Sequence, residues 1–101
     1  MNTILYMEIP GLPAYVKLSE NAHAIPLRGD MVRIEAEELP CPYSRKMLET
    51  IPASRCFVRN EETEKTSMAE FLKKCELTVY QREWHFENGR PACTLSVEVE
   101  W

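Results

Sequence analysis

Glycine is scarce in this chain: three residues among 101, at positions 11, 29 and 89. At least 17 residues separate each glycine from the next, so no two of them lie in one loop. Loops that hold phosphate groups need clustered glycines, because backbone N–H groups must approach the anion closely. The sequence therefore excludes the P-loop and dinucleotide-binding classes of nucleotide enzymes.

Aspartate and basic residues are also few. The acidic residues are fifteen glutamates and the single Asp30, and no segment has the alternating Asp and Asn ligands of an EF-hand loop. Lys and Arg number 12 against 16 acidic residues, which gives a net charge of −4 that is spread along the whole chain. This balance argues against nucleic-acid binding, since a basic surface normally supplies affinity for the phosphate backbone.

Close pairs of metal ligands are missing as well. The chain has four cysteines and two histidines, at Cys41, Cys56, Cys75, Cys93, His23 and His85. Structural zinc sites bring their ligands in close pairs such as CxxC or HxxxH, and neither spacing occurs here. We therefore expect no metal, no cofactor and no catalytic residue.

Long apolar runs are absent too. No stretch approaches the roughly 20 apolar residues that a membrane span requires. The segment Met1–Glu8 lacks the basic start and apolar run of a secretory signal. We therefore expect a cytoplasmic protein with no membrane partner and with reduced cysteines, although an even cysteine count would also fit two disulfides in a secreted chain.

The remaining composition is that of an ordinary globular protein, with 45% hydrophobic and 28% charged residues. At this length we expect a single domain over residues 1–101. Seven prolines divide the chain into short pieces, which favours strands over long helices. Alternation and β-rich composition predict strands over Thr3–Ile9, Ala14–Leu18, Leu27–Glu37 and Arg55–Asn60.

Two short helices are also predicted. Ser44–Ile51 has apolar residues on one face and is ended by Pro52. Ser67 and Glu70 match a capping box, and behind them four apolar residues follow helical spacing. The acidic run Glu61–Glu64 lacks apolar neighbours and is predicted to be a solvated loop.

The clearest signal is a hairpin near the C-terminus. Asn88-Gly89 between two β-rich runs favours a two-residue type I′ turn, which pairs Trp84 with Cys93 and Tyr80 with Val97. One face of this hairpin is then apolar and interrupted by Arg82, and we expect it to form much of the core. Its apolar members are Tyr80, Trp84, Phe86, Cys93, Leu95, Val97 and Val99, while Val79 falls on the polar face.

Together these elements predict an α+β protein that is mainly β. We expect five to seven short antiparallel strands in a small sheet with one or two short helices. The sheet is predicted to curl toward a partly open barrel of the SH3 or OB type.

For function, the sequence favours a non-catalytic interaction or assembly module that binds a protein partner or forms a homo-oligomer. The reason is the lack of catalytic motifs, together with sheet edges that can pair with another chain. An exposed apolar patch around Leu12, Tyr15 or Trp101 is expected. The residues expected to bind are Arg82, Trp84, Tyr80, His85 and Trp101.

Two alternatives stay open. Tyr80, Arg82 and Trp84 interleave aromatic and basic side chains at strand spacing, as on platforms that bind single-stranded nucleic acid. The second alternative is a small enzyme that acts through a Glu/His pair or through Cys41 with one of the two histidines.

Overall fold

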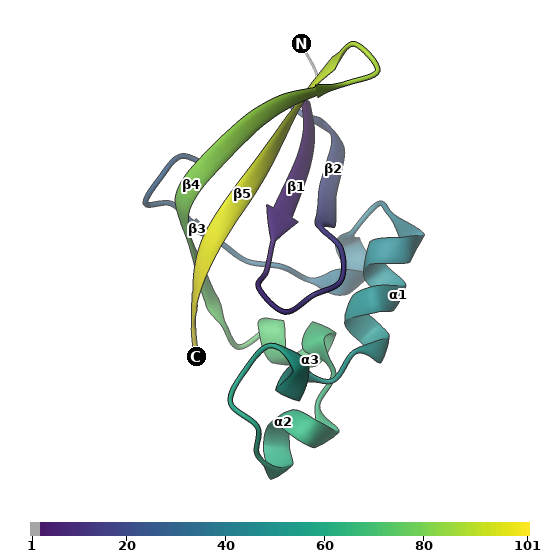
Figure 1. Ribbon diagram of the computed structural model, residues 1–101, viewed down its shortest axis with the longest axis vertical. Coiled ribbons are helices and arrows are strands. Elements are labelled where there is room, and N and C mark those ends of the chain that lie inside the picture. Colours follow the sequence, from purple (N-terminus) through teal and green to yellow (C-terminus); the bar gives the residue numbers. More distant parts are fainter. Residues whose placement is uncertain (1–2) are drawn as a thin grey trace.

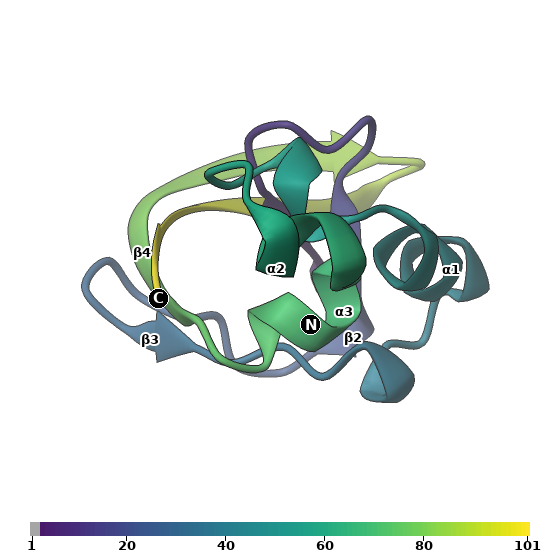
Figure 2. The same ribbon diagram turned by 90° about the horizontal axis from the view of Figure 1, so that it is seen from below.

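The computed structural model describes residues 3–101, which contain one five-stranded sheet with the strand order β2-β1-β5-β4-β3. Its strands are β1 Thr3–Glu8, β2 Val16–Ala22, β3 Met31–Val32, β4 Glu76–Glu87 and β5 Arg90–Glu100. Neighbouring strands are antiparallel except β1 and β5, which run parallel. The prediction of a wholly antiparallel sheet is therefore wrong, because β5 inserts between β1 and β4. The sheet curls into a half-barrel (Figure 2).

Three short α-helices gather at one end of this sheet (Figure 1). They are α1 Pro42–Thr50, α2 Glu61–Lys65 and α3 Met68–Leu72, with 3-10 turns at Ala36–Glu38 and Ala53–Arg55. The α+β class with a curled, mainly β architecture is thus as predicted, whereas the count of one or two helices is too low. Among residues 3–101, no helix combines the length and apolarity needed to cross a bilayer.

The additional helix is α2, in the acidic run that the sequence suggests is a loop. Asn60 caps it, since its Oδ1 accepts a hydrogen bond from the backbone N–H of Thr63 at 2.9 Å. The Thr63 hydroxyl accepts from the backbone N–H of Asn60 at 2.9 Å, which completes a reciprocal cap. The strand predicted over Arg55–Asn60 does not form, because a 3-10 turn and this cap occupy its two ends.

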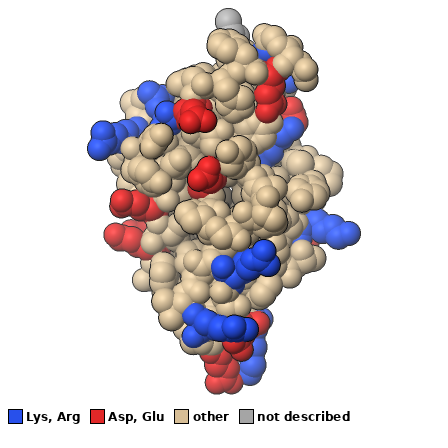
Figure 3. Space-filling view, in the orientation of Figure 1, with Lys and Arg blue, Asp and Glu red and all other residues tan. Residues whose placement is uncertain are grey.

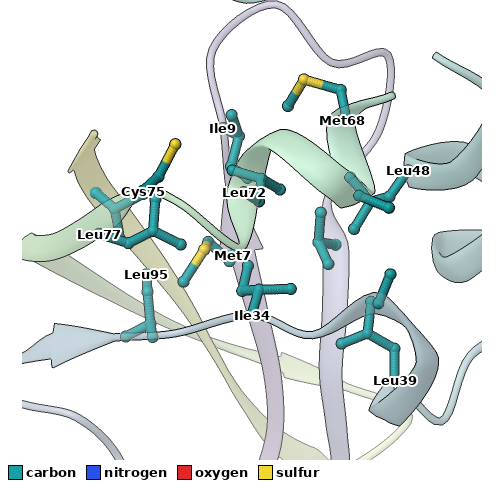
Figure 4. Packing of buried hydrophobic residues seen from close by; sticks show 14 of the residues in the cluster. Met7, Ile9, Ile34, Leu39, Leu48, Met68, Leu72, Cys75, Leu77 and Leu95 are labelled. Carbon is teal, nitrogen blue, oxygen red and sulfur yellow. The ribbon is translucent and has the colours of Figure 1, made fainter. Parts of the chain in front are cut away.

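The core lies between the inner face of the sheet and the helices (Figure 4). Met7 and Leu95, neighbours on β1 and β5, are both fully buried. Leu48 from α1 and Leu72 from α3 are also fully buried and belong to the same cluster. Each such side chain contributes about 1.5–3 kcal/mol when it leaves water. The predicted apolar faces of both helices are therefore confirmed as core faces.

The segment between β2 and α1 keeps its predicted alternation but not its predicted strand. Ile34 and Ala36 are buried, and Val32 packs against the core. Only Met31 and Val32 pair with β4, because the chain then leaves the sheet to reach α1. Inward-facing side chains thus do not require a ladder of hydrogen bonds on both sides.

The hairpin of β4 and β5 forms around the predicted turn, with Asn88 and Gly89 both at positive φ. Its predicted register holds from the turn back to Gln81 and Ser96. There a β-bulge adds Tyr80 as an extra residue, so that Val79 rather than Tyr80 pairs with Val97. The prediction that Val79 lies on the polar face is therefore wrong, since the bulge turns Val79 into the core.

The prediction that the hairpin aromatics are buried is also wrong. Tyr80, Trp84 and Phe86 are 45%, 50% and 78% exposed, whereas Cys93 opposite Trp84 and Leu95 opposite Arg82 are buried. The helices cover only one end of the sheet, and the distal half of the hairpin extends beyond them (Figure 1). Central β5 is enclosed by β1 and β4, but the distal part of β4 is not enclosed.

The first hairpin yields a stability test at Gly11, which has φ +97° in the turn between β1 and β2. A Cβ there would lie 3.0 Å from Cys56 Sγ and 3.1 Å from the carbonyl oxygen of Arg55. Gly11→Ala should lower the free energy of unfolding by about 1–2 kcal/mol from backbone strain. Crowding against the backbone should add about 1 kcal/mol or more.

Gly29→Ala is the matched control, because φ there is +96° but nothing lies within 4 Å of the added Cβ. Gly29→Ala should lower the free energy of unfolding by the backbone strain alone, without the crowding. Urea denaturation of both variants measures the difference, and equal losses would contradict the close packing of the Gly11 turn against Arg55 and Cys56.

Candidate functional site

The distal half of β4 forms an open sheet edge. On the side of β4 that lies away from β5, β3 pairs with Leu77 and Thr78. The last outer contact is at Val79, which donates its N–H to Asp30 O at 2.9 Å and accepts from Gly29 N at 2.7 Å. Beyond Val79, no strand of the described chain lies outside β4. We call the stretch Arg82–Phe86 the open edge.

The direction of the backbone groups along the open edge follows from the turn. Residues that flank a two-residue hairpin turn form a hydrogen-bonded pair, and such pairs then alternate along an antiparallel ladder. Glu87 and Arg90 flank this turn, so Glu83 and His85 also direct their backbone groups toward β5. Arg82, Trp84 and Phe86 therefore direct their N–H and C=O groups outward, where the described chain supplies no strand.

The side chains of the open edge divide between two faces. Arg82 and Trp84 lie opposite Leu95 and Cys93, on the inner face of the sheet. Glu83 and His85 alternate with them on the outer face. Tyr80, which is 45% exposed, has no partner on β5, so the bulge separates it from Arg82 and Trp84.

The opposite edge of the sheet, formed by β2, is protected. The backbone N–H of Lys17 donates to Ser44 Oγ of α1 at 3.0 Å. The N–H of Asn21 donates to Ser19 Oγ at 3.1 Å. Side chains, one of them from α1, thus occupy two of the backbone N–H groups of β2, as expected for an edge that avoids pairing with other chains. The open edge of β4 lacks this protection among the described residues.

His85 belongs to a polar and aromatic cluster on the outer face. Its ring stacks on Tyr6, with centroids 6.1 Å apart, and its Nε2 lies 3.5 Å from Glu87 Oε1. The Tyr6 hydroxyl donates to both carboxylate oxygens of Glu87, at 3.0 and 2.8 Å. Burial, and then the hydrogen bond to Glu87, raise the pKa of Tyr6. This cluster attaches the hairpin to β1 and holds the open edge in place.

Trp101, which the sequence also predicts to bind, packs against the aromatic residues of the helical end. It is 64% exposed, yet its ring packs edge-on against Phe57 at 5.0 Å and lies 6.0 Å from Phe71. Tyr15 packs instead against Tyr6 at 6.2 Å. The expected patch around Tyr15 and Trp101 is therefore divided between two aromatic clusters, and Trp101 lies outside the open edge.

Cys41 is the cysteine whose surroundings favour the thiolate. It precedes α1, and the backbone N–H of Ser44 is the main cause that lowers the pKa of its thiol. The Tyr43 N–H and Lys17 act in the same direction. Burial raises the pKa of the other three thiols, and all four cysteines are free. His85 instead stacks on Tyr6 and lies beside Glu87.

The described side chains form neither a metal-ligand cluster nor, on the face in view, a basic surface. Within residues 3–101, no three His, Cys, Asp or Glu side chains gather as metal ligands would. On the face shown in Figure 3, Lys and Arg are interspersed with Asp and Glu. In comparisons with known proteins, no family model, no curated protein and no solved structure matches this chain.

The surroundings of the thiols predict their order of reaction. At neutral pH, iodoacetamide should alkylate Cys41 faster than Cys56, because the thiolate fraction is larger where the pKa is lowered. Cys56 is the matched comparison, since both residues are partly buried. Mass spectrometry of peptides from the native protein measures both rates, and faster alkylation of Cys56 would contradict this assignment.

The Tyr6–Glu87 contact predicts an alkaline loss of stability. Because the pKa of Tyr6 is raised above its ordinary 10.0, the stabilisation is complete below that pH and lost as pH rises through the higher folded-state value. The free energy of unfolding should therefore fall more steeply with alkaline pH in the wild type than in Tyr6→Phe. Tyr43→Phe, at an exposed position on α1, is the control and should keep the wild-type slope.

Proposed function

We propose that this protein is a non-catalytic interaction module that binds another polypeptide by adding its strand to the open edge of β4. The observation that carries this proposal is the row of outward backbone groups at Arg82, Trp84 and Phe86, beyond the last contact with β3. Strand addition supplies main-chain hydrogen bonds, and alternate side chains supply specificity.

The side chains beside this edge support the same use. Trp84 and Phe86 are large apolar residues that stay largely exposed, and aromatic residues are enriched at interfaces between proteins. Soluble proteins blunt a free edge with Lys, Pro, a bulge, an inward-pointing charge or a covering element. The β2 edge is covered through Ser44, whereas the open edge has the bulge and the inward-facing Arg82 but no covering element among the described residues, and it presents two aromatic rings.

Two finer predictions belong with this proposal. The curled half-barrel supports a partly open architecture of the SH3 or OB type, because the sheet edges do not close on one another. The four free cysteines support a cytoplasmic setting, in which thiols stay reduced. Arg82, Trp84 and His85 are the proposed binding residues that lie at the open edge, while Tyr80 and Trp101 lie outside it.

Single-stranded nucleic acid is the alternative occupant of this surface. The exposure of Trp84 and Phe86 beside Arg82 favours it, since bases stack on exposed aromatic rings. Against it stand the net charge of −4 and the flanking Glu83 and Glu87. We therefore favour a polypeptide.

Trp84→Pro tests the proposal directly. The N–H of Trp84 points away from β5, so proline there removes an outward donor without removing a β4–β5 hydrogen bond. A column that carries immobilised wild-type protein should retain a polypeptide that a column carrying the Trp84→Pro variant does not retain. Hydrogen exchange with that polypeptide bound should slow the amides of Arg82, Trp84 and Phe86.

Tyr43→Ala is the matched control, because Tyr43 is an exposed aromatic residue on α1, outside the open edge. It should retain the same polypeptide as the wild type. Equal retention by the wild-type and Trp84→Pro columns would overturn the proposal. Quenching of Trp84 fluorescence by a single-stranded oligonucleotide at low salt would replace it with nucleic-acid binding.

A further inference from the structure

The open edge is complementary to a second copy of itself. Antiparallel pairing about a twofold axis at Trp84 would place Arg82 opposite Phe86 of the second copy, and Glu83 opposite His85 of the second copy. Residues that face each other across an antiparallel pair lie on the same side of the sheet. In this register, the two residues on either side of Trp84 thus meet partners of complementary chemistry.

The backbone directions agree with this register. Arg82, Trp84 and Phe86 all present outward N–H and C=O groups, and the axis at Trp84 pairs outward residues only with outward residues. Glu83 and His85, whose backbone groups face β5, then form the intervening pairs without backbone hydrogen bonds. In such pairs the two Cα atoms are only about 4.5 Å apart, so the side chains lie closer together than in hydrogen-bonded pairs.

Charge separates this register from its neighbours. An axis at Glu83 would set the two Glu83 carboxylates opposite each other, and an axis at His85 would set Glu83 opposite Glu87. An axis at Arg82 would oppose two guanidinium groups. Like charges directly opposite on paired strands are destabilising. Only the Trp84 axis pairs the whole open edge without opposing like charges.

On the inner face, the same register stacks aromatic and cationic groups. The two Trp84 rings meet at the axis, and each Arg82 guanidinium lies beside a Phe86 ring of the other copy. Arg over an aromatic ring and aromatic pairs across strands are both favourable contacts. These contacts would cover the two hairpin aromatics that the helices leave exposed.

We propose that two copies of this protein join β4 to β4 at the open edge, with Trp84 on the twofold axis, to form one continuous ten-stranded sheet. This inference rests on the proposed function and names its partner as a second copy of the chain. A twofold interface is self-complementary by construction, which is what the sequence around Trp84 provides. The contact ends before Val79, where β3 begins to occupy the outer side of β4.

Sedimentation equilibrium tests the assembly. The wild type should sediment at twice the mass of one chain, and Trp84→Pro should weaken association by about tenfold or more. Trp84→Ala keeps the outward N–H but removes the ring, so its association should be weaker than that of the wild type and stronger than that of Trp84→Pro. A wild type that stays monomeric at every concentration would overturn the inference.

Disulfide trapping tests the register independently of whether the proline variant folds. In a Cys41→Ser, Cys93→Ala background, Trp84→Cys should give a covalent dimer on mild oxidation, because the two thiols meet at the axis. Arg82→Cys is the control, since two residues at that position would lie about 13 Å apart along the paired strands. Equal trapping at both positions would overturn the register.

The two proposals fail separately. If the wild type is monomeric but its column still retains a polypeptide that the Trp84→Pro column loses, the dimer is wrong and strand addition stands. If neither self-association nor retention depends on Trp84, both are wrong.

Discussion

A single extra residue in β4 determines what each part of that strand faces. Up to Val79, the strand lies between β3 and β5, and its apolar side chains enter the core. Tyr80 then bulges out of the ladder, and the alternation restarts one residue later. Arg82 and Trp84 then lie opposite the buried Leu95 and Cys93, in the distal half of the hairpin, which extends beyond the helices. The bulge thus lets one strand complete the core at one end and present a free edge at the other.

The parts of the fold that the sequence predicts are those determined by neighbouring residues. Asn88-Gly89 specifies the turn because both residues adopt positive φ, and Ser67 caps α3 through the Glu70 N–H. The bulge at Tyr80 has no such local signal, because the alternation of the neighbouring residues fits an unbroken strand equally well. The reciprocal cap of Asn60 and Thr63 was a readable signal, but its partner is Thr rather than the usual Glu or Gln.

The sequence predicts where Arg82, Trp84 and His85 lie in the hairpin, but not what covers them. Their exposure depends on where the helices end, which periodicity along one strand does not encode. The same limit applies to Trp101, whose partners Phe57 and Phe71 lie far away in sequence. Burial is a property of the assembled layers, so a pattern that marks a face does not show whether that face is covered.

The insertion of β5 between β1 and β4 has a consequence for biogenesis. Within residues 3–101, the β1–β2 pair and the β4–β3 pair share no strand pairing, and β5 joins them. As the chain leaves the ribosome, β1 to β4 all precede the strand that unites them, so β1 and β4 each keep an unpaired edge until β5 has emerged. Contacts between β1 and β5 span most of the chain, and such distant pairings form slowly. The nascent protein thus passes through an interval with additional unpaired edges, during which a chaperone would have most to protect.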